Sequence, residues 1–143
     1  MIIDEVQTGF GRTGRMFACQ HHDLQPDLLC LAKGIAGGVP MGAIAFGERV
    51  TGIHSGVHGS TFGGNPLGAA IATEALTVLI EEGLIENANT LGEYFQERLA
   101  EIPSPHMKEV RGKGLLIGVE LKPEAGGARR FCEALRAKGI LCK

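Results

Sequence analysis

The first half of the sequence carries three kinds of group that could act together on one small cofactor. Asp4 follows two isoleucines, and Lys33 follows the apolar run "LLCLA". Each residue therefore stands near the end of an expected parallel strand, where open α/β sheets bind their ligands. A free ammonium is costly beside an apolar strand, and a Schiff base between Lys33 and an aldehyde resolves that conflict. The alternatives are that Lys33 extends to solvent and that Asp4 caps a neighbouring helix.

The third group is the segment "HGSTFGGNP", residues 58–66. It presents the hydroxyls of Ser60 and Thr61 and free backbone amides ahead of an expected helix, an arrangement that suits a phosphate. A plain glycine-rich capping loop is the alternative. Together, an acid for a pyridinium nitrogen, a lysine for an aldehyde and donors for a phosphate are the protein contacts of pyridoxal 5'-phosphate. Their co-occurrence favours this cofactor.

A competing interpretation comes from Gly9, Gly11 and Gly14, which form the G-x-G-x-x-G pattern of dinucleotide-binding folds. In such folds an apolar strand leads directly to the first glycine and a long helix follows. Here polar residues interrupt the strand, and "HHDLQPD" soon breaks any helix. The pattern alone therefore gives weak support for NAD binding.

Composition limits the classes of function. The chain has 143 residues, 44% of them hydrophobic and 21% charged, with a formal net charge of −2. That charge provides no basic field for nucleic acid, and no run approaches the roughly 18 apolar residues of a membrane helix. No signal peptide is recognisable, so we expect a cytoplasmic protein. The four cysteines are widely spaced, which favours neither a metal site nor disulfides.

The pattern of apolar residues and turn signals predicts an α/β fold. We expect a buried strand over residues 1–6 and two more strands in "PDLLCLAKG" and "VPMGAIAFGE". Asn65 and Pro66 predict the start of a helix that ends at Gly83.

A second amphipathic helix is expected over residues 85–102, with Ala88, Leu91, Phe95 and Leu99 on its inner face. "PSP" at residues 103–105 ends that helix. Two strands and a helix follow. We therefore predict two parts: residues 1–103 from a large cofactor-binding domain, and residues 104–143 from an incomplete smaller α+β domain.

The motifs "DEVQTGFGRTG", "LAKGIAGGVPMGA" and "HGSTFGGNPLGAA", in this order, resemble the class III, ornithine-type aminotransferases of pyridoxal-phosphate fold type I. The similarity continues through "VRGKGLLIGVEL" and "FCEALRAKGILCK" and so covers essentially the whole chain. The resemblance implies the large domain of that fold, with a mostly parallel sheet and helices, and the start of its small domain.

The resemblance also implies roles for individual residues. Asp4 would pair with the pyridine nitrogen, Val6 would pack on the ring, and Gln7 would hydrogen-bond its phenolic oxygen. Lys33 would carry the Schiff base and exchange the substrate proton. Thr61 would contact the phosphate of the cofactor in the partner subunit of a homodimer. Ser60 would lie near the substrate.

The implied reaction moves the distal amino group of ornithine, N-acetylornithine or a related ω-amino acid to 2-oxoglutarate. A 4-aminobutyrate-type enzyme is the nearest alternative, and a non-catalytic α/β remnant that binds a partner subunit is another. Chains of this family are nearly three times as long. We therefore expect a fragment that is inactive or aggregation-prone in isolation.

Overall fold

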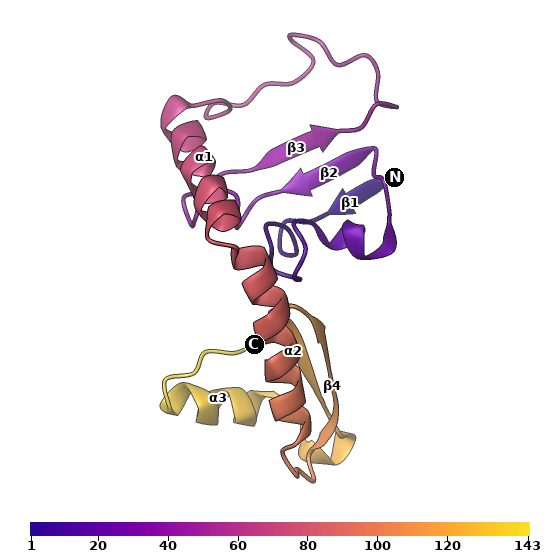
Figure 1. The fold of residues 1–143 in the computed structure, drawn as a ribbon, viewed down its shortest axis with the longest axis vertical. Helices are drawn as coiled ribbons and strands as arrows, with labels where there is room; N and C mark the ends of the chain where they lie inside the picture. Colours follow the sequence, from indigo (N-terminus) through magenta and orange to yellow (C-terminus); the bar gives the residue numbers. More distant parts are fainter.

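The computed structural model describes residues 1–143 and consists of an upper sheet-containing part and a lower part, linked by consecutive helices (Figure 1). The upper part is a three-stranded sheet with the helix α1 beside it. The lower part holds the helices α2 and α3 and a two-stranded hairpin. The fold is α/β, as the sequence predicts.

The upper sheet contains β1 (Ile2–Asp4), β2 (Leu28–Leu31) and β3 (Ala43–Phe46), in that order. β1 and β2 are parallel, with Asp4 opposite Cys30, and β2 and β3 are antiparallel. The three predicted strands are confirmed, but within this chain the sheet is mixed rather than mostly parallel. The cause lies in residues 32–42, which contain no helix, because a parallel connection needs a crossover of about a dozen residues or more.

β1 is shorter and less buried than the sequence predicts. It pairs only with β2, so its other edge has no neighbour in this chain, and Ile2 is 68% exposed. On the strand at the opposite edge of the sheet, β3, the side chains of Ile44 and Phe46 are also exposed. In all, 14 of 143 residues are buried, so the chain does not cover its own apolar faces.

α1 (Pro66–Glu81) begins and ends where the sequence predicts. The side chain of Asn65 accepts a hydrogen bond from the amide of Gly68 at 2.7 Å, and Pro66 occupies the first turn. Beyond the helix, Gly83 has a φ of +64°, a left-handed conformation that suits glycine. α1 packs through Ala72 against the segment that follows β2.

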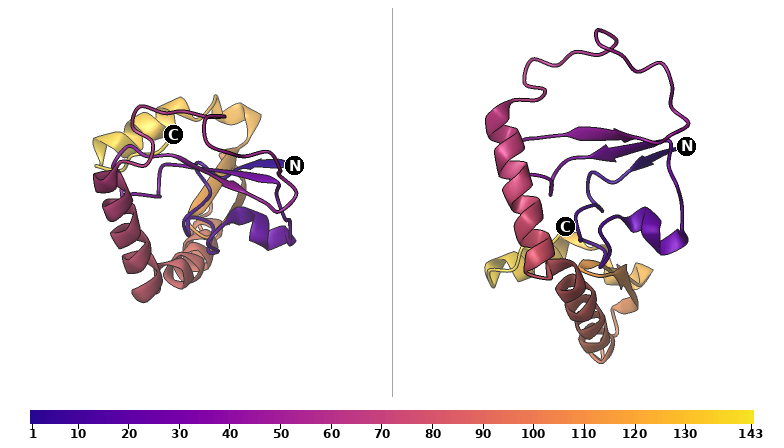
Figure 2. Two further views of the ribbon diagram at one scale, coloured as in Figure 1. Left: turned by 90° about the horizontal axis from the view of Figure 1, so that it is seen from above. Right: turned by 45° about the horizontal axis from the view of Figure 1, so that its top comes forward.

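The lower part is built on α2 (Leu84–Ala100), β4 (Met107–Lys113) and β5 (Leu116–Leu121). β4 and β5 form an antiparallel hairpin, and α2 lies along it in all views (Figures 1 and 2). α3 (Arg129–Ala137) completes this part, and short 3-10 turns cover Ala18–His22 and Pro123–Ala125.

The predicted inner face of α2 is confirmed at Ala88, which is buried, and at Leu99, which is half-buried, but it is wrong at Leu91 and Phe95. Leu91 is 45% exposed and Phe95 is 50% exposed, whereas Ala88 and Gly92 are buried. Gly92 meets the hairpin turn so closely that a Cβ atom there would lie 2.1 Å from the carbonyl oxygen of Gly114. Small residues therefore set this contact, because they allow the two backbones to approach.

The domain boundary at residue 103 stays a prediction. α2, which precedes that boundary, packs against β4, which follows it. All four cysteines are free, and no cluster of three or more His, Cys, Asp or Glu side chains could hold a metal ion. None of the helices has the length and apolar character needed to cross a membrane.

Candidate active site

Asp4 and Lys33 leave the sheet at the same edge. Asp4 is the last residue of β1, and Lys33 lies two residues beyond the end of the neighbouring parallel strand β2. Both side chains are exposed. One oxygen of Asp4 accepts a hydrogen bond from the amide of Val6 at 2.9 Å, and the Lys33 amine forms no ion pair with any residue of this chain. Both groups are therefore available to a ligand.

Lys33 and Gln7 line one cavity of about 400 Å³. Its walls come from the glycine loop, the turn after β2, α1, α2 and the start of β5, through Gly9, Phe10, Gly11, Arg12, Gly34, Leu79, Leu84, Ala88, Leu115 and Leu116. The structure thus brings together two of the residues predicted to hold the cofactor, at a junction between the two parts of the chain.

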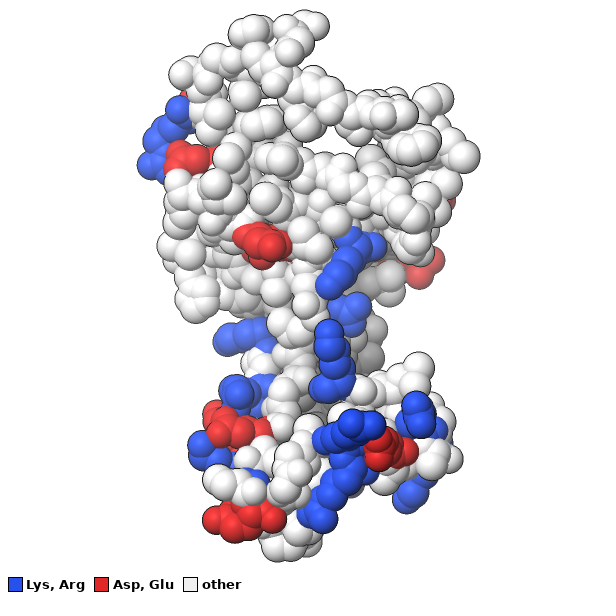
Figure 3. Space-filling model, turned by 180° about the vertical axis from the view of Figure 1, so that it is seen from behind, with Lys and Arg blue, Asp and Glu red and all other residues white.

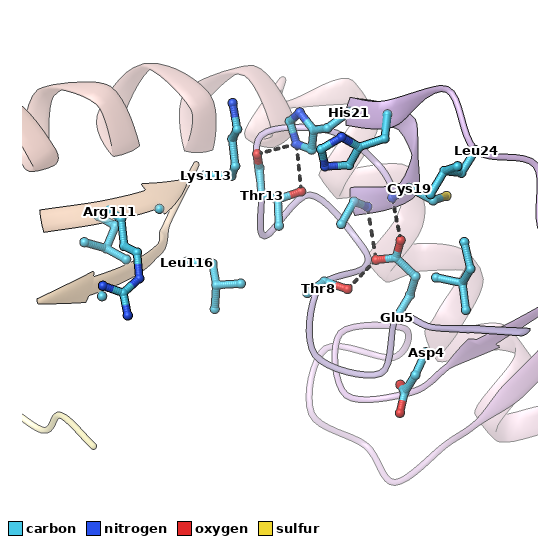
Figure 4. A pocket seen from close by; sticks show the side chains of 16 residues that line it. Asp4, Glu5, Thr8, Thr13, Cys19, His21, Leu24, Arg111, Lys113 and Leu116 are labelled. Atoms are coloured by element: carbon cyan, nitrogen blue, oxygen red, sulfur yellow. Dashed lines mark hydrogen bonds between the residues drawn. The ribbon is translucent and has the colours of Figure 1, made fainter. Parts of the chain in front are cut away.

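Asp4 instead lines a neighbouring, larger cavity of about 740 Å³ (Figure 4). The far wall of that cavity is the hairpin, which contributes Arg111 and Lys113. Asp4 and Lys33 share the carboxyl edge of the parallel strands but line different cavities in this chain. Val6, two residues after Asp4, is half-buried.

Ser60 and Thr61 stand apart from this edge. They lie in the long loop between β3 and α1, which extends beyond the sheet (Figures 1 and 2), and both are exposed. Neither lines the two cavities described above. Within one copy of the chain they do not join Asp4 and Lys33.

Glu5 is a residue whose importance sequence reasoning missed. Its side chain is 1% exposed and accepts hydrogen bonds from the Thr8 hydroxyl, from the amide of Ala18 at 3.0 Å and from the amide of Cys19 at 2.8 Å (Figure 4). Burial raises the pKa of Glu5, but these donors outweigh it, so the pKa lies below its ordinary value. The only sequence signal was an acid placed directly after Asp4 at the end of an apolar strand.

The same carboxylate acts on Cys19. Burial raises the pKa of the Cys19 thiol, and the negative charge of Glu5 raises it further. Cys19 therefore stays a neutral thiol, in keeping with a structural role.

The glycine loop is held from two sides. The imidazole Nε2 of His21 lies 3.0 Å from the carbonyl oxygen of Thr13, a buried residue. On the other side, the hairpin turn presses against the loop, because a Cβ atom on Gly114 would lie 2.4 Å from the carbonyl carbon of Thr13. The amide of Leu115 also donates to the carbonyl of Arg12 at 3.0 Å. The loop that follows Gln7 is therefore fixed by the lower part of the molecule.

The charges of the hairpin are paired with one another. The carboxylate of Glu120 lies 2.5 Å from the Lys108 amine and 2.6 Å from the Arg111 guanidinium. Hydrogen bonds from these two cations lower the pKa of Glu120 and raise their own. Figure 3 shows that much of the Lys and Arg on the rear face lies over the lower part, with acids among it. Arg111 thus has a structural partner of its own.

The family model for class III aminotransferases matches residues 1–143. The chain belongs to the class III aminotransferase family. It is 48% identical over 145 residues to an ornithine aminotransferase of Brevibacillus brevis, covering 100% of this chain and 36% of that relative. It is 49% identical to an ornithine aminotransferase of Bacillus subtilis, of which it covers 35%.

Solved structures agree with the sequence relatives. The ornithine δ-aminotransferase of Plasmodium falciparum superposes with a TM-score of 0.89 at 43% identity, over 99% of this chain and 38% of that one. An acetylornithine aminotransferase from Elizabethkingia anophelis superposes with a TM-score of 0.86 at 44% identity, over 99% of this chain and 37% of that one. The family and the fold expected from the motifs are confirmed, and the chain spans about a third of the length of these relatives.

Proposed function

We propose that this class III aminotransferase chain is part of a pyridoxal-phosphate-dependent transaminase. The observation that carries the proposal is the placement of Asp4 and Lys33 at the carboxyl edge of two adjacent parallel strands, where α/β folds bind ligands. The donor would be ornithine, N-acetylornithine or a related ω-amino acid, and the acceptor 2-oxoglutarate. The names of the relatives, ornithine and acetylornithine aminotransferases, support this substrate class.

The residues present fit the cofactor. The amine of Lys33 is exposed and unpaired and shares a cavity with Gln7, while one carboxylate oxygen of Asp4 is free of protein donors. When bound, pyridoxal phosphate supplies an aldehyde and an electron-accepting pyridinium ring. Asp4 would keep the ring nitrogen protonated, Gln7 would donate to the phenolic oxygen, and Val6 would pack on the ring.

Lys33 would bind the aldehyde through Nζ and, once displaced by the amino donor, would remove the proton from the carbon that bears the amino group. The same amine would later give that proton back, so Lys33 would act first as a base and then as an acid. This role requires a side chain that can move between two positions, which fits an exposed lysine beyond the end of a strand.

The position of Ser60 and Thr61 supports a site shared between two subunits of a homodimer. Their loop is exposed and does not line the cavity of Lys33 in one copy, so Thr61 would reach the phosphate, and Ser60 the substrate, of the partner subunit. The rest of the polypeptide would cover the exposed faces of β1 and β3. We place the protein in the cytoplasm, with no nucleic-acid or membrane partner.

The alternative of another class is a non-catalytic unit that binds a partner subunit. A cofactor titration separates the two. The full-length protein should gain a visible absorption band on addition of pyridoxal phosphate, and Lys33→Ala should lose it. A full-length protein whose spectrum is only that of free cofactor would overturn the proposal. A single-turnover screen of ornithine, N-acetylornithine, 4-aminobutyrate and lysine derivatives would then assign the donor.

A further inference from the structure

Glu5 is the one charged side chain that the fold buries, and it stands among the residues proposed to hold the cofactor. Asp4 precedes it, and Val6 and Gln7 follow it. A buried carboxylate is costly unless donors surround it, so a residue of this kind calls for a specific explanation.

The Glu5 carboxylate ties together segments that are distant in the chain. One oxygen, Oε2, accepts from the Thr8 hydroxyl and from the amide of Ala18, and the other, Oε1, accepts from the amide of Cys19. The 3-10 turn Ala18–His22 is thereby held against the end of β1 (Figure 4). These charge-assisted hydrogen bonds are stronger than neutral ones.

The main chain of Glu5 is fixed as well. Its amide donates to the carbonyl of Cys30 on β2 at 2.9 Å, and its carbonyl accepts from the amide of Gly9 at 2.9 Å. A Cβ atom on Gly9 would lie 2.9 Å from that carbonyl oxygen, so the turn from residue 5 to residue 9 is tight. Every polar group of Glu5 therefore holds the backbone in one conformation.

We propose that Glu5 is a positioning residue, whose buried carboxylate fixes the backbone that aims Asp4 and Gln7 at the cofactor. The hydrogen bond from the Val6 amide to Asp4 depends on the chain turning away immediately after β1, and the carboxylate of Glu5 holds that turn. This inference rests on the proposed function, because it concerns the same site.

Glu5→Gln in the full-length protein is the sharpest test. Oε2 receives two donors and Oε1 one, so either orientation of the new amide sets its NH₂ group against a backbone N–H or the Thr8 hydroxyl. We expect cofactor affinity to fall about tenfold and the visible circular dichroism of the bound cofactor to weaken. Thr8→Val, which removes one donor only, should give a smaller change of the same kind. Glu74→Gln, an exposed acid on α1, is the matched control.

The outcomes separate the two proposals. If wild-type protein shows a visible band that Lys33→Ala removes, while Glu5→Gln and Thr8→Val keep wild-type affinity and circular dichroism, the positioning role is wrong and the proposed function stands. If Glu5→Gln lowers only the midpoint of thermal unfolding, Glu5 is structural and the inference is again wrong. If the wild-type protein forms no such band, the proposed function itself fails.

Discussion

Replacing Gly92 by alanine should weaken the contact between α2 and the hairpin, and through it the glycine loop beside the candidate site. The Cβ atom would lie 2.1 Å from the carbonyl oxygen of Gly114 and 2.3 Å from its carbonyl carbon. Ordinary contacts between carbon and oxygen are about 3.3 Å, so the hairpin turn must move by roughly 1 Å. It has little room, because on its other side Gly114 already presses on Thr13.

Two terms of opposite sign set the magnitude. In an exposed helix, a change from glycine to alanine stabilises by about 1 kcal/mol. Overpacking of a tight contact costs about 1–3 kcal/mol. Here the cost should lie at or above the upper end of that range, because the added atom meets backbone and no change of rotamer can relieve the clash. We expect Gly92→Ala to lower the free energy of unfolding by about 2 kcal/mol.

Urea unfolding of the full-length protein measures this loss. Because the urea slope of a protein about three times this length is about 3 kcal/mol/M or more, the midpoint should fall by at most roughly 0.7 M. Gly59→Ala is the matched control, since a Cβ atom there would meet nothing within 4 Å, and its midpoint should stay at the wild-type value. A Gly92→Ala protein as stable as wild type, or more stable, would show that helix propensity outweighs the contact between α2 and the hairpin.

Three further predictions concern separate parts of the chain. Asn65→Ala removes the side chain that caps α1 and should cost about 1 kcal/mol in urea unfolding, whereas Asn65→Asp should cost far less; equal losses would contradict the capping role. Lys108 and Arg111 lower the pKa of Glu120, so the stability that this carboxylate provides is present at neutral pH and is lost as the pH falls through that lowered pKa. Glu120→Gln should therefore flatten the loss of stability between about pH 6 and pH 3. An unchanged pH profile would count against the charge cluster of Lys108, Arg111 and Glu120. Thr61→Ala should leave the urea midpoint unchanged, because the residue is exposed, yet weaken cofactor binding by about tenfold if the site is shared between subunits; unchanged binding would argue against that sharing.

The elements of this fold that depend on local signals could be predicted from the sequence. The start of α1 follows from Asn65 and Pro66, and its end from Gly83, because capping and left-handed backbone have direct signatures in residue type. The edge shared by Asp4 and Lys33 follows from two apolar runs that end in polar residues. These signals are local and do not depend on the tertiary contacts of the chain.

Features set by packing could not be predicted in this way. The apolar periodicity of α2 favoured Leu91 and Phe95 as its inner face, but the closest contact runs through Gly92, whose role appears only when Gly114 is beside it. Glu5 looked like one more polar residue in the glycine-rich segment, because the amides of Ala18 and Cys19 that stabilise it lie more than ten residues away. Such long-range partners have no local signature.

The role of Lys33 can be tested by reducing the full-length protein with borohydride in the presence of pyridoxal phosphate and mapping the modified peptide by mass spectrometry. Asp4 and Lys33 lie at one edge of two parallel strands, and under the proposed function Lys33 would bind the aldehyde while the carboxylate of Asp4 faces the ring nitrogen. We expect a phosphopyridoxyl group on Lys33 and none in the Lys33→Ala protein. A label on any other lysine, or an equal label in both proteins, would contradict it.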